Sequence, residues 1–337
     1  MKKRKIIIVL FATVLIFSLF SCQGSEKRYT FDGMVQGTYY HIVVYAKSDE
    51  GLKQGFDSIF SAIDNSVNLW QKNSIINKVN RNENYKLDKI FIDNFNASEK
   101  MSNLTDGAFD ITVGALVREY GFTTQKREKL TDSQVDSMLR YVGYKNIRLE
   151  NNKIIKKYPQ TQLDFNAIAQ GYTTDCVSNY LIKRGINSFV VDVGGEVYAK
   201  GRKEDGKKWN VAIETPAKDS LSEQEYSCYV KLENESIVTS GSYRKFYVEN
   251  GVKYSHTTDP KTGKPVLHSL LSASVIAKTS TTADGLATAF MVMGLDKAKE
   301  FLNNHKEYQA YFIYCDEKGN MKTYYTQGFT KYLKNIN

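Results

Sequence analysis

Asp284 and Thr288 stand four residues apart in the run TTADGLATAF, residues 281–290. In a helix this spacing puts the carboxylate and the hydroxyl on one face, about one turn apart. Such a pair offers two oxygen donors in a fixed geometry, and oxygen is the donor that hard cations such as Mg²⁺ take. The alternative is that Asp284 caps the helix start, because Thr281 and Thr282 precede it.

Five further segments concentrate polar side chains and glycines. Each segment alone has a structural explanation, since glycine pairs and a DPKTG run form turns. A single histidine is likewise more often structural than catalytic. The segments are DGAFDITVGALV (106–117, with Asp110), LDFNAIAQGYTTD (163–175, with Asp164), DVGGEVYAKG (192–201), VTSGSYRKFY (238–247, with Arg244) and YSHTTDPKTGKP (254–265, with His256).

Several well-known catalytic patterns are missing from the sequence. No G-x-G-x-x-G follows a predicted strand and no G-x-x-x-x-G-K-[ST] occurs, so the phosphate-binding turns of Rossmann and P-loop proteins are lacking. No H-E-x-x-H and no nucleophile elbow occur either. These absences argue against a Rossmann oxidoreductase, a P-loop nucleotidase, a zincin protease and an α/β-hydrolase.

The elements that must position these residues can be read from periodicity. Residues 29–46 alternate and predict a pair of strands. Helical spacing predicts a helix from about residue 52, capped by Asp49, and another that ends before TDGAFD. The polar stretch 123–152 predicts helix and loop. A third helix begins near Ala167 and ends at Gly185, which suits a C-cap.

Short strands follow, and helices resume at about 282–304 with a break at Gly294 before a final strand, AYFIYC. The pattern is not a regular succession of βαβ units. It predicts an α+β fold with mixed, largely antiparallel sheets and packed helices.

The N-terminus has the pattern of a secretion signal. MKKRK precedes the apolar stretch 6–20, which is short for a membrane span and ends in LFSC. This ending resembles the lipobox of bacterial lipoproteins, which would make Cys22 the lipidated first residue; an uncleaved anchor is the alternative. The predicted organisation is a signal peptide (1–21), a tether (22–28) and one domain (29–337) in which two intimate subdomains can be accommodated.

Charge and cysteine content exclude other classes. Residues 22–337 hold 42 basic and 37 acidic side chains, a mild excess mixed along the chain, so nothing points to nucleic acid. Cys176, Cys228 and Cys315 lie far apart without C-x-x-C spacing. Buried thiols are the main interpretation, one disulfide is the alternative, and a metal–thiolate site is disfavoured.

Taken together and in order, the segments resemble the ApbE family, the FAD:protein FMN transferases. The matching runs are MVQGTYY, GAFDITVG, DFNAIAQGY, VDVGGEV, TSGSYRKF, SHTTDPKTGKP and ADGLATAF. The resemblance implies a T-fold-like core with an inserted or N-terminal helical subdomain. It also implies that FAD is split at its pyrophosphate, that FMN moves to a Ser or Thr hydroxyl of a target protein, and that AMP leaves.

The family pattern also implies roles for individual residues. Asp284 and Thr288 would bind Mg²⁺ with their side chains, joined by a backbone carbonyl near Ala167, which agrees with the preference of this ion for oxygen donors. His256 would be a base or a phosphate contact, with Asp259 orienting it or binding adenosine. The residues implied to contact FAD are Met34, Trp70, Ala108, Phe109, Asp110, Asp164, Gln170 and His256; for Trp70, simple core burial is the alternative.

One position departs from the family pattern. Gln170 stands in AQGY where many members have lysine in KGY, so a cation that could meet a phosphate is replaced by a neutral amide. Weaker FAD binding, or recruitment of Arg244 or Lys261, would follow. Gln170 still forms hydrogen bonds, and the retained Asp284 and Thr288 argue for activity.

Two other functions fit the same residues. A Mg²⁺-dependent FAD pyrophosphatase would use water in place of the protein hydroxyl, and a flavin-binding lipoprotein would carry FAD without turnover. The family implies acceptors of the sodium-pumping NADH:quinone reductase or Rnf type. The predicted location is a bacterial membrane, lipid-anchored and facing the periplasm.

Overall fold

The computed structural model describes residues 25–120, 130–216, 225–241, 246–249, 252–255 and 257–334, the segments 246–249 and 252–255 by their backbone alone. Three residues singled out above, Cys22, Arg244 and His256, lie outside the described residues. None of the described helices has the length and apolar composition needed to cross a bilayer.

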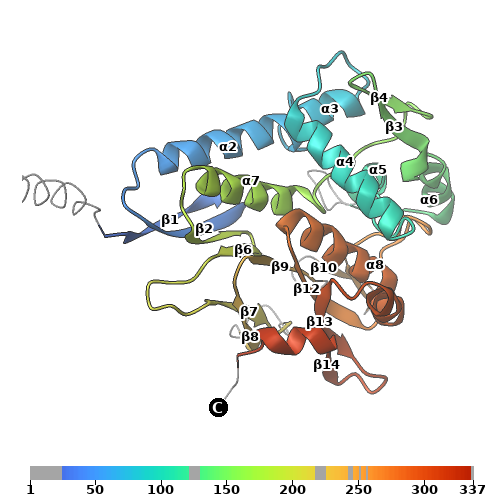
Figure 1. The fold of residues 1–337 in the computed structure, drawn as a ribbon. Helices are drawn as coiled ribbons and strands as arrows, with labels where there is room; N and C mark the ends of the chain where they lie inside the picture. Colours follow the sequence, from blue (N-terminus) through green and yellow to red (C-terminus); the bar gives the residue numbers. More distant parts are fainter. Residues whose placement is uncertain are drawn as a thin grey trace, which may run out of the picture.

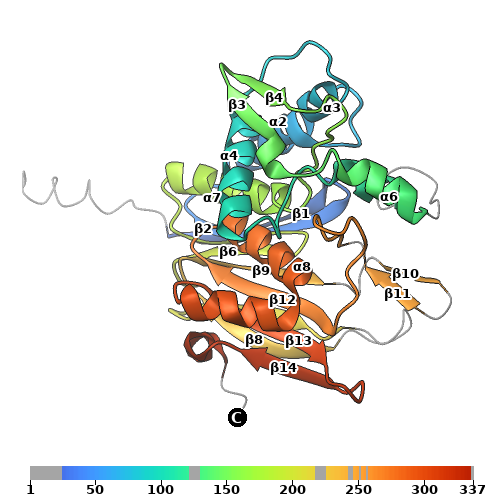
Figure 2. The same ribbon diagram turned by 90° about the vertical axis from the view of Figure 1, so that its right-hand side faces the viewer.

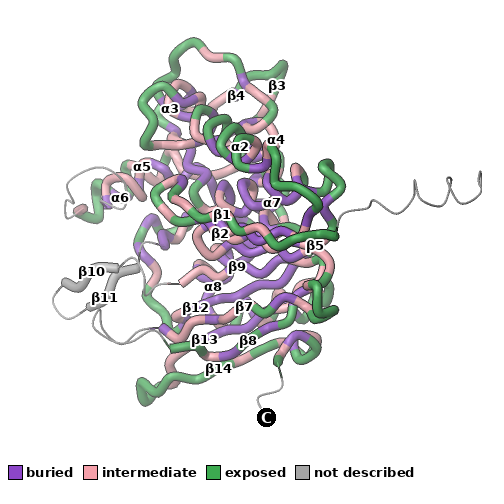
Figure 3. Tube along the Cα trace, turned by 90° about the vertical axis from the view of Figure 1, so that its left-hand side faces the viewer, coloured by how far each residue is buried: buried purple, intermediate pink, exposed green. Residues whose placement is uncertain are grey.

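The described chain is built on an eight-stranded antiparallel sheet with the order β1-β2-β5-β6-β9-β12-β13-β14 (Figures 1 and 2). In the strands β12 and β13, several successive residues are buried, so both faces of the sheet are covered there, and Figure 3 draws much of these strands in purple. The strands are β1 (Lys27–Val35), β2 (Thr38–Ala46), β5 (Ser188–Val193), β6 (Glu196–Lys200), β9 (Glu235–Gly241), β12 (Leu270–Ala277), β13 (Gln309–Cys315) and β14 (Met321–Tyr325).

One face of the sheet packs against helices. Alternate residues of β2 and β5, such as Ile42 and Val191, meet the apolar faces of α2 and α7. Helix α8 covers β9, β12 and β13, and α4 packs against α8. A β-hairpin and smaller helices lie beyond α4. The helices are α2 (Leu52–Val67), α3 (Ile75–Asn80), α4 (Lys89–Leu104), α5 (Gly114–Glu119), α6 (Asp132–Leu139), α7 (Ala169–Lys183) and α8 (Ser280–Asn304), with the 3₁₀ helix η1 (Tyr144–Asn146) and the hairpin β3 (Ile147–Glu150) and β4 (Lys153–Lys156).

The opposite face packs against a second hairpin, β7 (Trp209–Glu214) and β8 (Tyr226–Leu232), and the 3₁₀ helix η2 (Gln327–Tyr332). Trp209, Val230 and Phe329 are almost fully buried there. A two-stranded sheet of β10 (Phe246–Glu249) and β11 (Val252–Ser255) completes the described elements. The predicted α+β class with antiparallel sheets is therefore confirmed, whereas a division into subdomains stays a prediction.

Two glycines show how local backbone geometry ends helices here. Gly185 (φ 77°) follows α7, where its amide bonds to the Ile182 carbonyl and the Ile186 amide bonds to the Leu181 carbonyl, as the sequence predicts for a C-cap. Gly294 (φ 75°, ψ 176°) interrupts α8 at the predicted break. Both positions need a left-handed φ, which glycine adopts without a Cβ clash.

Some local predictions are wrong. Asp49 does not cap α2 with its side chain; Gly51 (φ 73°) is the N-cap residue, and Asp49 contributes only its carbonyl oxygen to the Leu52 amide. The strand AYFIYC is followed by a further strand, β14, and the short helix α3 was not predicted. Short elements like these carry too few periodic positions to stand out in the sequence.

The three cysteines of the described chain are free thiols, so the disulfide alternative is not realised. Burial raises the pKa of the Cys176 and Cys228 thiols to about 11. Both thiols are therefore protonated at neutral pH and inert as nucleophiles.

Candidate active site

A cavity of about 430 Å³ lies where the β1–β2 turn, the start of α7, the end of β9 and the middle of α8 meet. This volume is typical of a small-molecule site. Most of the predicted site residues line it, although they come from segments that lie up to 218 residues apart in the sequence. They are Trp70, Ala108, Phe109, Asp110, Asp164, Ala167, Gln170, Asp284 and Thr288.

Asp284 is held between α7 and α8. Its side chain is 4% exposed, and its Oδ2 accepts a hydrogen bond from the Gly171 amide at 3.0 Å. The helices approach closely because residue 171 has no side chain: a Cβ there would lie 2.5 Å from the Ser280 carbonyl oxygen and 2.8 Å from the Asp284 Cβ. The placement of Asp284 thus depends on a glycine one helix away.

A second carboxylate also joins α7 and α8, but here the carboxylate belongs to α7 and the donors belong to α8. Asp175 on α7 accepts hydrogen bonds from the backbone amides of Ser280 (2.8 Å) and Thr281 (2.9 Å) and from the Thr281 hydroxyl. The N-cap of α8 is Thr279. The capping alternative for Asp284 is therefore wrong, because Asp175 and Thr279 satisfy the first amides of this helix.

The Asp284 carboxylate is in an unfavourable electrostatic position. Burial raises its pKa, the Gly171 amide opposes the shift, and the negative charge of Asp175 adds to it. Among the described residues no cation pairs with this carboxylate. One turn further along α8, the Thr288 hydroxyl lies 3.3 Å from the Ser240 hydroxyl. A buried carboxylate with this surrounding is stabilised when a cation binds it.

The donor set fits magnesium better than a transition metal. Within the part of the chain that the structure describes, no three His, Cys, Asp or Glu side chains cluster around one point. What the cavity offers is one carboxylate (Asp284), one hydroxyl (Thr288) and the main chain at Ala167. Mg²⁺ uses few protein oxygens and completes its shell with phosphate oxygens and water. Asp284, Thr288 and Ala167 would hold the ion.

Among the described residues, all the charged side chains that line the cavity are acidic. Asp110, Asp164, Glu196 and Asp284 line the cavity, and no lysine or arginine does among the described residues. Lys261, which could have replaced the family lysine, lies outside this lining and pairs with Asp106 at 3.3 Å. A cation bound at Asp284 would reduce the repulsion between these carboxylates and a phosphorylated ligand.

Asp110 and Asp164 organise the wall that carries Ala167. Asp110 accepts hydrogen bonds from the amide (2.8 Å) and hydroxyl (2.6 Å) of Thr112 and from the Tyr144 amide (2.7 Å). Burial raises the pKa of the Asp110 carboxyl, and these bonds oppose the shift. Asp164 accepts a bond from the Asn166 amide at 2.7 Å, which forms a tight turn before Ala167. Their predicted contacts to FAD stay predictions.

The aromatic residues divide into one exposed and one buried side chain. Trp70 is 51% exposed at the cavity, so the alternative that it is simply a core residue is wrong. Its backbone amide is fixed by the Asn68 side chain at 2.8 Å. Phe109 is 2% exposed and belongs to the core behind the cavity. Trp70 is thus free to stack on a planar ring.

Met34 does not line the cavity. It lies on β1 with 75% of its surface exposed, and its predicted contact with FAD stays a prediction. The adjoining turn lines the cavity through Gln36, Gly37 and Thr38. Gln36 has a left-handed backbone (φ 52°), and its side-chain amide bonds to the Thr173 hydroxyl at 3.1 Å. The QG pair in MVQGTYY was the sequence signal for this turn.

Gln170 and the turn after His256 also flank the cavity. Gln170 packs against Gly194: a Cβ added at residue 194 would lie 2.6 Å from the Nε2 atom of Gln170. Thr257 and Thr258, directly after His256, line the wall. Asp259 accepts bonds from the Lys261 amide (2.8 Å) and the Thr262 hydroxyl (3.2 Å), so its carboxylate closes the local turn. Sequence reasoning gave no role to Glu196 or Ser240, which also line the cavity.

A model of the ApbE family matches residues 36–312. The chain belongs to the ApbE family. The resemblance inferred from the ordered motifs is thereby confirmed. Among curated proteins of the ApbE family, the FAD:protein FMN transferase of Haemophilus influenzae is 32% identical over 312 residues, covering 88% of this chain and 90% of that protein. The one from Vibrio cholerae is 31% identical over 297 residues, covering 86% and 88%.

Solved structures of the ApbE family share the fold. The flavin transferase ApbE from Vibrio cholerae matches with a TM-score of 0.82 at 29% identity, over 91% of this chain and 100% of that one. The apo flavinyl transferase ApbE from Pseudomonas stutzeri matches with a TM-score of 0.82 at 28% identity, over 92% and 98%. The similarity therefore extends across the cavity and both faces of the sheet.

Proposed function

We propose that this protein transfers FMN from FAD to a Ser or Thr hydroxyl of a target flavoprotein and releases AMP. The observation that carries the proposal is the convergence of Asp284, Thr288 and Ala167 on a cavity that Trp70 borders with an exposed ring. Its relatives of similar length named FAD:protein FMN transferase support the same activity. The acceptors we propose are extracytoplasmic subunits of the NADH:quinone reductase or Rnf type.

The charge of the wall explains why a metal ion is part of the proposal. A pyrophosphate brings negative charge to a cavity that holds four carboxylates and, among the described residues, no lysine or arginine. When bound to Asp284 and Thr288, Mg²⁺ would neutralise phosphate oxygens and the charge that develops on the departing AMP. Gln170 stands where many family members have lysine and adds no positive charge. A larger share of the neutralisation of the phosphate charge would therefore fall to the metal ion.

The proposed reaction is one in-line displacement at phosphorus. The acceptor hydroxyl oxygen bonds to the phosphorus of the FMN half, and the bond from that phosphorus to the oxygen bridging to AMP breaks. The electron pair leaves with AMP, and the hydroxyl proton passes to a base, for which His256 is the candidate. Asp175 and Gly171 keep α8 in register with α7, which positions Asp284 for this step.

Water in the place of the acceptor hydroxyl would give the alternative activity, hydrolysis of FAD to FMN and AMP. The two activities need the same cavity and the same ion. A flavin-binding lipoprotein without turnover is the third function that fits the residues. We further propose that Cys22 is lipidated and that the body lies on the periplasmic side of a bacterial membrane.

The deciding experiment incubates the protein with FAD, Mg²⁺ and a candidate acceptor, with and without EDTA, and follows the products by mass spectrometry. Transfer predicts an FMN adduct on the acceptor and free AMP, both abolished by EDTA and by Asp284→Asn. Free FMN with AMP and no adduct would indicate the pyrophosphatase. Adduct formation that persists after complete metal removal would overturn the proposed mechanism, and no product at all would leave only the binding function.

A further inference from the structure

Basic side chains gather at one end of the central sheet. The strand registers place the start of β1, the end of β2, the start of β5 and the end of β6 together at this end. The same loops lie on the left-hand side of Figure 1. We call this surface the basic end and define it as residues 25–28, 47–51, 182–188, 200–208 and 233–234.

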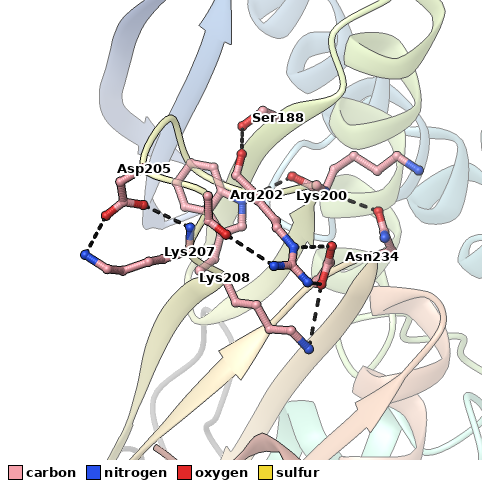
Figure 4. A network of polar contacts seen from close by, with 11 residues as sticks. Ser188, Lys200, Arg202, Asp205, Lys207, Lys208 and Asn234 are labelled. Carbon is pink, nitrogen blue, oxygen red and sulfur yellow. Dashed lines mark hydrogen bonds and ion pairs between the residues drawn. The ribbon is translucent and has the colours of Figure 1, made fainter.

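The basic end holds most of the excess charge of the protein. It contains ten basic and six acidic side chains, a net charge of +4, whereas all of residues 22–337 carry 42 basic and 37 acidic. Figure 4 shows its loop 200–208, where Arg202 pairs with Glu233 at 2.9 Å and Lys207 with Asp205 at 2.9 Å. Lys27, Lys47 and Lys183 are exposed and have no ion pair among the described residues.

The cavity lies at the opposite end of the same strands. Gln36 follows the end of β1, and Gly194 and Glu196 join the end of β5 to the start of β6. From Lys27 to Val35 the strand advances by about 26 Å, at roughly 3.3 Å per residue. An acceptor whose hydroxyl enters the cavity therefore approaches the end of the sheet that carries the cavity, and the basic end is available to another partner.

The position of the tether favours a lipid surface as that partner. Cys22, the proposed lipidation site, precedes Lys27 by five residues, which span at most about 18 Å when extended. A basic surface held this close to a bilayer meets the anionic headgroups, and each lysine or arginine near such a surface adds to the attraction. An acyl anchor together with a basic patch binds membranes more stably than either alone.

We propose that the basic end docks on anionic phospholipid headgroups and holds the cavity on the side of the protein that faces away from the bilayer. The orientation rests on the proposed anchor at Cys22, whereas the headgroup binding rests on the charge and placement of the loops. Acceptor domains would then receive FMN about 26 Å or more from the membrane surface, because this is the length of the strand between the basic end and the cavity.

The test uses a chain that begins at Gln23, because every described element starts at Lys27 or later and is retained. Its sedimentation with phosphatidylcholine vesicles is compared with that of vesicles containing phosphatidylglycerol, at low ionic strength and at about 1 M salt, where the screening length is only about 3 Å. We expect binding to the anionic vesicles alone, and loss of binding at high salt.

Two charge-reversal variants with equal net charge locate the surface. Lys27→Glu/Lys47→Glu/Lys183→Glu changes the basic end, and Lys86→Glu/Lys100→Glu/Lys318→Glu changes exposed lysines elsewhere. Since one basic residue at an anionic surface corresponds to about fivefold in binding, the first variant should bind at least tenfold more weakly. The second should bind as the unmodified chain does, and both should turn over FAD normally.

An equal loss of vesicle binding in both variants, or equal binding of the unmodified chain to neutral and anionic vesicles, would overturn the proposal. The first variant alone could instead bind vesicles as the unmodified chain does but transfer FMN to the acceptor more slowly. This result would identify the basic end as a protein-docking surface and would equally refute docking on lipid. The anchor is tested separately by the intact mass of the full-length protein purified from membranes. A missing lipid there would refute the orientation and leave the vesicle result standing.

Discussion

Replacing Gly171 by alanine tests whether the close contact of α7 and α8 positions the proposed metal ligands Asp284 and Thr288. The new Cβ would lie 2.5 Å from the Ser280 carbonyl oxygen and 2.8 Å from the Asp284 Cβ, against an ordinary contact of about 3.4 Å or more. Backbone atoms cannot rotate away as a side chain can, so α8 must move by nearly 1 Å. Overpacking of this kind costs about 1–3 kcal/mol of folding free energy.

The movement also displaces Asp284 and Thr288 from Ala167, because they lie on α8 whereas Ala167 precedes α7. A shift of about 1 Å in a catalytic arrangement can lower kcat by about 100-fold. We expect Gly171→Ala to lose about 1–3 kcal/mol in urea denaturation, with a Tm lower by roughly 2–4 °C per kcal/mol. The Mg²⁺ concentration for half-maximal FAD turnover should rise at least about tenfold.

Gly285→Ala is the matched control. It lies on α8 beside Asp284 and gains the same helix propensity. The three atoms nearest to its new Cβ all belong to the Met101 side chain, with Cε at 2.9 Å and Cγ at 3.0 Å. This variant should keep its stability within about 1 kcal/mol and its Mg²⁺ requirement unchanged. If Gly171→Ala were as stable as the unmodified protein and required no more Mg²⁺, the contact would not set the ligand geometry.

Three further predictions concern the carboxylates and the exposed ring. Asp175→Asn presents an amide donor to groups that themselves donate, so urea denaturation should show a loss of about 2–3 kcal/mol; an unchanged midpoint would argue against the clamp. Burial raises the pKa of Asp110, so its stabilising contribution is greatest below the unfolded pKa and is lost as pH rises through the higher folded pKa. Denaturation at stepped pH should show this component, and Asp110→Asn should lack it. Trp70→Ala should raise the KM for FAD about tenfold and leave the Tm unchanged, because the ring is 51% exposed; an unchanged KM would refute stacking.

Long periodic segments could be predicted from the sequence, and short ones could not. The paired strands of residues 27–46, the helix α4 and the break of α8 at Gly294 were anticipated because alternation, helical spacing and a helix-breaking glycine are local properties. Asp49 suits an N-cap by residue type, whereas in the structure Gly51 holds that position with a left-handed φ of 73°.

The candidate site shows the same division. The types of the proposed metal ligands are visible in TTADGLATAF, but the burial of Asp284 depends on its contact with α7, more than 100 residues earlier in the chain. The contribution of Gln36, Ser240 and Glu196 to the cavity was not predicted, since polar residues in turns and at strand ends look alike until the strands are ordered in a sheet.

The sequence by itself determined the family, the class of fold and the residues able to hold an ion, because ordered motifs and local periodicity are written directly in the chain. Only the tertiary structure decided which carboxylates face the cavity and which close turns, and that the cavity and the basic end lie at opposite ends of the sheet. The physical reason is that burial, desolvation and strand order arise from contacts between distant segments, and no local pattern encodes them.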